Sequence, residues 1–129
     1  MTRVLVAEDD PPVAEIMQTG LQKAGYEVVL ASNGQAALEI ALAGSVDIAL
    51  LDLRMPPGIS GIDVVREIRE REANSPRHLP VILFTATQDQ DEQNRGMQAG
   101  ADAYRVKPMR LAHLVSLIQS LLPGAPPAS

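Results

Sequence analysis

Five short apolar runs alternate with helical segments along this chain. The runs cover residues 3–7, 27–31, 48–51, 81–84 and 103–106. Each run is followed by a segment that favours a helix. This alternation is typical of a parallel sheet whose right-handed crossover helices lie on both faces. The sequence therefore predicts an α/β fold, a flavodoxin-like doubly wound sheet of five parallel strands in the order 2-1-3-4-5.

The composition narrows the class of protein. A chain of 129 residues is the usual size of one domain, so residues 1–122 would form a single folded unit, with residues 123–129 as a flexible tail or linker stub. The absence of cysteine excludes disulfides and thiolate chemistry and fits a reducing cytoplasm. The net charge is −5 and the basic residues are scattered, which argues against direct nucleic-acid binding. No apolar stretch is long enough for a membrane span or a signal peptide.

Local signals place the ends and the faces of the helices. Asp10 stands before Pro11, which predicts a helix N-cap followed by proline in the first turn. The segment 88–99 carries few large apolar residues and has Gly96 in its interior, which costs about 1 kcal/mol relative to alanine. We therefore expect it to be the least stable helix. The alternating charges of residues 66–72 are interpreted as a solvated outer helix face.

Polar side chains follow four of the five predicted strands, at the point where each strand ends. They are Glu8 and Asp9 after the first strand, Asp52 after the third, Thr85 after the fourth and Lys107 after the fifth. Because the carboxyl ends of parallel strands meet at one edge of the sheet, these side chains would converge in a crevice there. The sequence therefore predicts a site made of three carboxylates, a hydroxyl and an ammonium group.

The residue types in this crevice suit phosphoryl transfer. Three neighbouring carboxylates repel one another unless a cation lies among them, and oxygen ligands suit Mg²⁺, with Mn²⁺ as an alternative ion. Glu8 and Asp9 would hold the ion directly or through water. Asp52 would give one oxygen to the metal and the other, as nucleophile, to a phosphoryl group, forming an aspartyl phosphate. Lys107 would neutralise charge on the transferring group, and the Thr85 hydroxyl would donate to a phosphoryl oxygen.

Each residue, taken alone, also has a structural explanation. Asp9 or Thr85 could cap a helix, Lys107 could be solvated, and Tyr104 at a strand edge could be half-buried packing. An aspartate that merely ends a strand is equally ordinary. The functional interpretation depends on all of these residues meeting at one edge of the sheet.

The chain resembles the response-regulator receiver domains of two-component signalling, including the chemotaxis-regulator type. The resemblance covers about residues 3–122. The motifs that carry it are the acidic pair Glu8-Asp9, the phosphoacceptor segment 51–56, the hydroxyl segment Thr85-Ala86, the aromatic residue Tyr104 and the pair Lys107-Pro108.

This resemblance implies phosphotransfer from a histidine kinase or a phosphotransfer protein to Asp52, with Mg²⁺ bound. It implies that the backbone carbonyl of Arg54 is a metal ligand, that the Ala86 backbone helps Thr85 and Lys107 stabilise the phosphate, and that the bond before Pro108 is cis. Arg54 and Thr87 would tune the lifetime of the phosphoryl group. The chain would accept the group and lose it again without being a turnover enzyme.

The resemblance also implies a switch. Thr85 would move toward the phosphoryl group and Tyr104 would rotate inward, so that the surface of the fourth helix, fifth strand and fifth helix changes for a downstream protein target. A homodimer through that surface is an alternative use. The chain departs from the family pattern at Glu8, where aspartate is commoner, in the loop 55–61, which is one residue longer, and in the long connection 74–80.

Other classes of protein fit the sequence less well. A phosphohydrolase of the haloacid-dehalogenase type has a second aspartate two residues after the nucleophile, where this chain has Arg54. A flavodoxin-like electron carrier needs a phosphate-binding loop after the first strand, where acidic residues would repel the phosphate. A histidine phosphotransfer module is a helical bundle, and His78 and His113 are expected to be surface residues. A receiver that works without phosphorylation is disfavoured because Asp52 and its neighbours are all present.

Overall fold

A computed structural model of the chain describes residues 1–56, 58–86 and 88–122, so the predictions for Thr87 and for the tail 123–129 lie outside the described residues. The strands are β1 (Arg3–Ala7), β2 (Glu27–Ala31), β3 (Ile48–Asp52), β4 (Val81–Thr85) and β5 (Ala103–Val106). The helices are α1 (Pro11–Lys23), α2 (Gly34–Leu42), α3 (Gly61–Glu72), α4 (Gln90–Ala99) and α5 (Leu111–Leu121). Strands and helices alternate throughout, as the sequence predicts.

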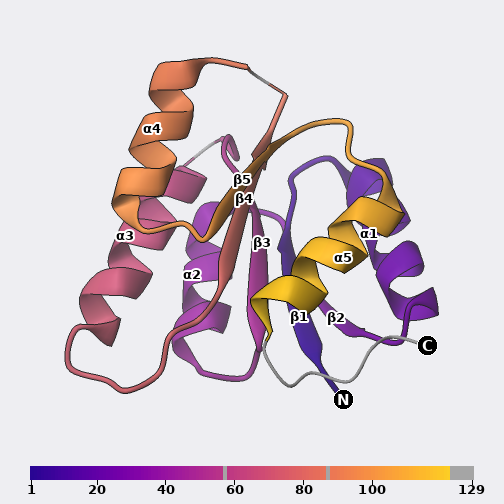
Figure 1. The fold of residues 1–129 in the computed structure, drawn as a ribbon, viewed down its shortest axis with the longest axis horizontal. Helices are drawn as coiled ribbons and strands as arrows, with labels where there is room; N and C mark the ends of the chain where they lie inside the picture. Colours follow the sequence, from indigo (N-terminus) through magenta and orange to yellow (C-terminus); the bar gives the residue numbers. More distant parts are fainter. Residues whose placement is uncertain (57, 87, 123–129) are drawn as a thin grey trace.

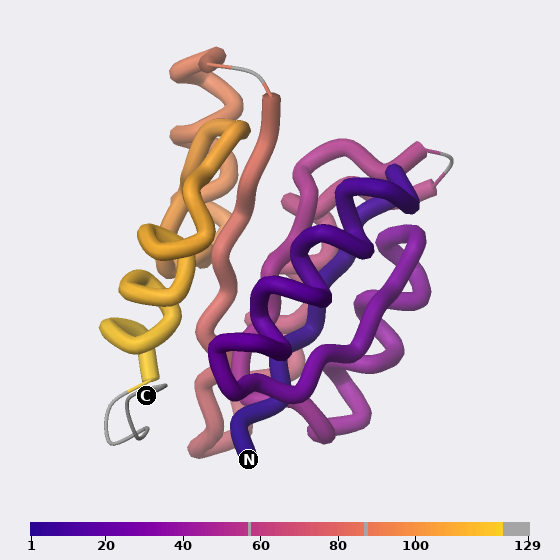
Figure 2. The backbone as a smooth tube through the Cα atoms, turned by 90° about the vertical axis from the view of Figure 1, so that its right-hand side faces the viewer, coloured from indigo at the N-terminus to yellow at the C-terminus, as the bar shows by residue number. Residues whose placement is uncertain are grey.

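The strands form one parallel sheet in the order β2-β1-β3-β4-β5, which confirms the predicted doubly wound fold. Helices α1 and α5 cover one face, and α2, α3 and α4 cover the other (Figure 1). In Figure 2, α1 and α5 lie next to each other, and the loops after β3 and β4 lie at the same end of the molecule. That end is the carboxyl edge of the sheet.

The central strands read as unbroken apolar runs because both of their faces are buried. Along β1, Leu5 and Ala7 enter the core under α2 and α3, whereas Val4 and Val6 enter the core under α1 and α5. Strands β3 and β4 are buried along their whole length. A strand covered by helices on both sides has no polar face, so its sequence does not alternate.

Helix ends follow the predicted positions, with two differences. Asp10 is the N-cap of α1, but its side chain makes no cap hydrogen bond. Pro11 and Pro12 fill the first two helical positions, and proline has no N–H, so one of the usual donors to a cap side chain is missing. Helix α4 begins at Gln90 rather than at residue 88, because the Asp89 side chain accepts a hydrogen bond from the Asp91 N–H (2.9 Å) and sets the start there.

Gly96 lets α4 approach the sheet closely. A Cβ at this position would lie 2.8 Å from Cδ1 of Leu83 and 3.4 Å from the ring of Tyr104. The buried residues of α4 are Glu92 and Gly96, and Met97 is exposed. The packing of this helix therefore rests on close backbone approach more than on large apolar side chains, and its low stability stays a prediction.

The interpretation of residues 66–72 as a solvated face is wrong for Arg69 and Glu72. The Arg69 side chain is only 17% exposed. It donates to the backbone carbonyls of Gly100 (2.9 Å) and Leu79 (2.8 Å), and to the carboxylates of Glu72 (2.7 Å) and Asp102 (2.8 Å). Arg69 follows Val65 by one helical turn, so it lies beside the buried stripe of α3 and not opposite to it.

These contacts form the Arg69 network, defined here as Arg69, Glu72, His78, Gly100 and Asp102. His78 is exposed at the surface, as predicted, and its Nε2 lies 2.8 Å from Oδ1 of Asp102. Gly100 has φ +117°, and a Cβ there would lie 2.6 Å from Cγ of Arg69, so glycine is required for two reasons. The network lies where β4 and β5 begin, at the edge of the sheet opposite to Asp52.

Within the parts of the chain that the structure describes, none of the helices combines the length and the apolar character needed to cross a bilayer.

Candidate functional site

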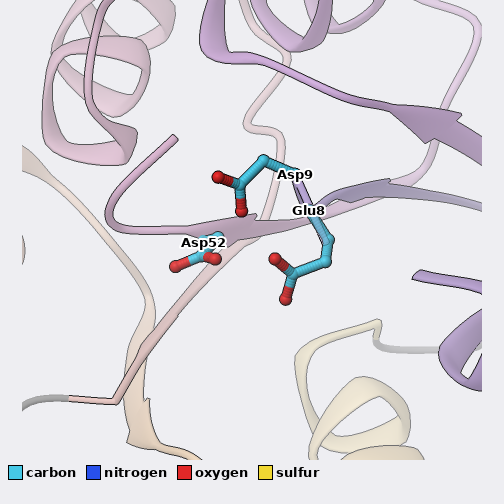
Figure 3. A group of neighbouring side chains, drawn as sticks. All are labelled: Glu8, Asp9 and Asp52. Atoms are coloured by element: carbon cyan, nitrogen blue, oxygen red, sulfur yellow. The ribbon is translucent and has the colours of Figure 1, made fainter. Parts of the chain in front are cut away.

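Three carboxylates meet at the carboxyl edge of the sheet. Glu8 and Asp9 follow β1, and Asp52 is the last residue of β3, which pairs directly with β1. Figure 3 shows the three side chains around a common space. One oxygen from each lies within 4.8 Å of one from each of the others. Glu8 and Asp52 are buried and Asp9 is exposed, so the cluster opens to solvent on the Asp9 side.

Lys107 provides the cation of the cluster. Its Nζ donates to Oε1 of Glu8 (2.7 Å) and to Oδ2 of Asp52 (3.0 Å), and it lies 5.1 Å from the centre of the Phe84 ring. The peptide bond between Lys107 and Pro108 is cis. Glu8, which stands where aspartate is commoner in the family, therefore contacts the ammonium group together with Asp52.

Two opposing effects act on the Lys107 ammonium. Partial burial lowers its pKa, but the hydrogen bonds to Glu8 and Asp52 outweigh burial and hold the pKa above its ordinary value. Because the folded-state pKa is raised, the stabilising effect is fully present below the ordinary lysine pKa and is lost only as the pH rises through the raised value. Lys107 is therefore a cation throughout the neutral range.

The donor set fits a hard divalent cation. Three carboxylates face one ammonium group, so the site keeps excess negative charge that Mg²⁺ would offset. Glu8, Asp9 and Asp52 would hold the ion. The backbone N–H of Arg54 donates to Oδ1 of Asp52 (3.3 Å), which places the Arg54 main chain beside the cluster. Coordination by the Arg54 carbonyl stays a prediction.

A cavity suited to an anion adjoins the carboxylates. It has a volume of about 330 Å³ and is lined by Asp52, Arg54, Thr85, Ala86 and Lys107. The structure thus brings together, around Asp52, the residues that the sequence assigns to phosphate stabilisation. Two cationic side chains and a hydroxyl are the groups that favour a phosphoryl oxygen over water.

Sequence reasoning missed the partner of Arg54. Nη2 of Arg54 donates to Oε2 of Glu92 (2.8 Å), in the first turn of α4. The side chain of Glu92 is 11% exposed, whereas that of Arg54 is 68% exposed. No local pattern marks Glu92, because a glutamate in a first helical turn is favourable on a solvated helix as well.

Tyr104 is buried, not half-buried at a strand edge. Its ring lies against Gly96, and its hydroxyl has no hydrogen-bond partner among the described residues. Burial raises the pKa of the phenol, and the negative charges of Glu92 and Asp89 raise it further. The rotation of this ring on phosphorylation stays a prediction.

Gly61 is expected to position Asp52 through the backbone. It opens α3, and a Cβ there would lie 2.6 Å from the carbonyl oxygen of Asp52, so Gly61→Ala must displace the strand end. We expect a loss of about 1–3 kcal/mol in the free energy of unfolding, measured in urea.

Gly20→Ala is the matched control for Gly61→Ala. The three atoms nearest to its Cβ would all belong to the side chain of Leu111, which is able to turn away, so a change below about 1 kcal/mol is expected. Equal losses in the two variants would contradict the positioning role of Gly61.

The fold and the site together define a doubly wound α/β domain with an acidic pocket at the carboxyl edge of its sheet. A family model for the response regulator receiver domain matches residues 4–119. Response regulator ArlR of Staphylococcus saprophyticus is 34% identical over 126 residues, which are 98% of this chain and 54% of that protein. The transcriptional regulatory protein CusR of Escherichia coli is 34% identical over 120 residues, 93% of this chain and 51% of that protein.

A similar solved structure is that of the response regulator protein TrrA from Thermotoga maritima in complex with Mg²⁺ and BeF. It has a TM-score of 0.81 and 36% identity, and the match covers 95% of this chain and all of that chain. The chain belongs to the response regulator receiver family, which confirms the resemblance seen in the sequence. It spans about half the length of the two regulators above.

Proposed function

We propose that this domain is the phosphoacceptor module of a two-component phosphorelay. A phosphoryl group would pass from a histidine nitrogen of a kinase or phosphotransfer protein to a carboxylate oxygen of Asp52, breaking the P–N bond and forming a P–O bond. The observation that carries this proposal is the double position of Asp52. Its carboxylate belongs to the acidic cluster and also lines the anion cavity with Lys107 and Thr85.

The residues around Asp52 have separable roles in this proposal. Glu8 and Asp9 hold Mg²⁺, which when bound neutralises charge on the phosphoryl oxygens. Lys107 is held between Glu8 and Asp52, so its ammonium group already lies beside the carboxylate that would attack. Thr85 and Ala86 also line the cavity, and the Thr85 hydroxyl and the Ala86 backbone would donate to the transferred group. The chain accepts one phosphoryl group and does not turn over a substrate.

The proposed output is a change in the surface formed by α4, β5 and α5. Thr85 ends β4, and Tyr104 in β5 lies under α4, so a shift at the phosphoryl site reaches this surface through both strands. The surface would serve a downstream protein target or a second copy of the chain, in the cytoplasm. Receiver domains of response regulators interact in general with histidine kinases and effectors.

The phosphohydrolase alternative is weaker at the level of chemistry. It requires a carboxylate two residues after the nucleophile to act as acid and base, and the group at that position is the guanidinium of Arg54. Steady release of phosphate from a phosphate ester by the purified chain would favour that alternative.

The test of the proposed function is the intact mass of the protein after incubation with a small-molecule phosphodonor. We expect one added phosphoryl group when Mg²⁺ is present and little or none when a chelator removes it. Phosphoryl uptake that is equally fast with the chelator would contradict the metal role, and no uptake at all would contradict the phosphoacceptor role.

Lys107 competes with the metal for the same carboxylates, which gives a second expected result. In Lys107→Met, Glu8 and Asp52 lose an ammonium group at 2.7 and 3.0 Å, so Mg²⁺ meets less competing positive charge. We expect Mg²⁺ to bind roughly tenfold more tightly, equivalent to about 1.4 kcal/mol, by titration calorimetry. Lys23→Met, which removes an exposed lysine, is the control. Unchanged or weaker Mg²⁺ binding in Lys107→Met would show that the lysine does not compete with the metal.

A further inference from the structure

Glu92 is a buried carboxylate on the helix that forms part of the proposed output surface. It belongs to the first turn of α4, and its side chain is 11% exposed. A buried carboxylate is costly without a cation, and Arg54 supplies that cation at 2.8 Å. Glu92 is one of the two buried residues of α4, so the ion pair with Arg54 offsets the burial of a charge at the start of this helix.

Arg54 also belongs to the site around Asp52. It lines the anion cavity with Asp52 and Lys107, and its backbone N–H donates to Oδ1 of Asp52. The hydrogen bond and the charge of Glu92 raise the pKa of the guanidinium, which is a permanent cation. The side chain of Arg54 is 68% exposed, so little packing opposes its movement. Arg54 is therefore an exposed cation that lies between the buried carboxylate of Glu92 and the proposed phosphoryl site at Asp52.

We propose that Arg54 exchanges partners when Asp52 is phosphorylated, leaving Glu92 for the phosphoryl oxygens and so releasing the first turn of α4. This inference rests on the proposed phosphoacceptor function and adds a residue, Glu92, that reports the state of the site to the output surface. Glu92 acts as a positioning residue, because it holds the Arg54 guanidinium away from the phosphoryl group until that group arrives.

The direction of the exchange follows from charge and geometry. A phosphoryl group carries about −1.5 to −2 charges near neutral pH and offers three acceptor oxygens, whereas Glu92 offers a single negative charge. Guanidinium groups bind such oxygens in a bidentate manner. After the exchange, Glu92 is buried without its cation, and a movement of α4 that brings it to solvent removes that cost. Since Gly96 contacts Tyr104, a movement of α4 also reaches β5.

The test compares the parent chain of 129 residues with Arg54→Ala, Glu92→Gln and the double variant. Each is incubated with Mg²⁺, with and without excess phosphoramidate, and the phosphorylated fraction is read by intact mass in the same samples as hydrogen exchange. In the parent, we expect phosphorylation to speed amide exchange at the start of α4 roughly tenfold. Without phosphodonor, Arg54→Ala, which leaves the Glu92 carboxylate unpaired, should already exchange at that faster rate, and phosphorylation should add little. Glu92→Gln leaves no buried charge, so it should exchange slowly in both states.

The decay of the phosphoryl group supplies a readout that a merely structural role of Glu92 would leave unchanged. Arg54→Ala removes the guanidinium from the phosphoryl group, whereas Glu92→Gln makes it more available. The two variants should therefore shift the decay rate in opposite directions, and Glu92→Gln should have no further effect in the double variant. Arg66→Ala, which breaks a surface ion pair on α3, is the control and should behave as the parent does.

Two results separate the proposals from each other. If the parent is phosphorylated but exchange in α4 is the same in both states, the partner exchange of Arg54 is refuted and the phosphoacceptor function stands. If the parent takes up no phosphoryl group, both proposals fail. A faster α4 exchange in Arg66→Ala would also overturn the assignment, because the effect would then belong to any lost surface charge.

Discussion

The Asp52→Asn variant is expected to take up no phosphoryl group from a small-molecule phosphodonor in the presence of Mg²⁺. The amide has no nucleophilic carboxylate oxygen, while its carbonyl still accepts the Arg54 N–H, so the backbone of the site is preserved. Removal of one of three neighbouring negative charges also relieves repulsion. We therefore expect a thermal unfolding midpoint at or above that of the parent, which shows that lost uptake is not lost folding.

Asp10→Asn is the matched control for this loss. Asp10 is an exposed carboxylate two residues after Glu8, and its side chain makes no cap hydrogen bond. Uptake should stay close to that of the parent when read by intact mass. Phosphorylation that persists in Asp52→Asn would show that another residue accepts the phosphoryl group. That result would contradict the proposed function.

The Arg69→Ala variant is expected to lose about 3 kcal/mol in the free energy of unfolding, which is a large part of the about 5–15 kcal/mol typical of a domain. The substitution deletes four side-chain hydrogen bonds and leaves the carboxylates of Glu72 and Asp102 without their arginine. The Glu72 carboxylate still accepts a hydrogen bond from the Leu79 N–H, and the Asp102 carboxylate still accepts one from the Val81 N–H. The two negative charges therefore stay near each other and repel. Urea unfolding followed by circular dichroism measures the loss.

Two variants bracket the Arg69 result. Arg66→Ala removes a neighbouring arginine that is 57% exposed and pairs only with Asp63 at 3.4 Å among the described residues, so its cost should be below about 1 kcal/mol. Arg69→Lys keeps the charge but cannot reach two carbonyls and two carboxylates together, so it should fall between the parent and Arg69→Ala. A loss below about 1 kcal/mol in Arg69→Ala would show that Arg69 contributes no more than a residue of a solvated helix face, as the sequence suggests.

The fold was predictable because the signals that define it are local. The central strands have both faces buried, so they stand out as apolar runs, and α1 begins where Asp10 and Pro11 predict its start. The site around Asp52 was predictable for a related reason. Parallel strands deliver whatever follows them to one edge, so residues at the ends of the runs meet without any knowledge of side-chain packing.

Charged residues whose role depends on distant partners were not predictable. Arg69 stands in a row of alternating charges, and only the packing of β4 and β5 against α3 reveals three of its four acceptors. Glu92 is another such case, because its partner lies 38 residues earlier in the chain.

The predicted cap hydrogen bond of Asp10 is absent for a different reason. The position was correct, but the proline at the second helical position supplies no N–H.

The two edges of the sheet hold separate tasks. The carboxylates and Lys107 lie at one edge, and the Arg69 network ties α3 to the starts of β4 and β5 at the other. The connection 73–80 could therefore be redesigned to raise the thermal stability of the domain. The rates at which Asp52 gains and loses a phosphoryl group should then stay unchanged.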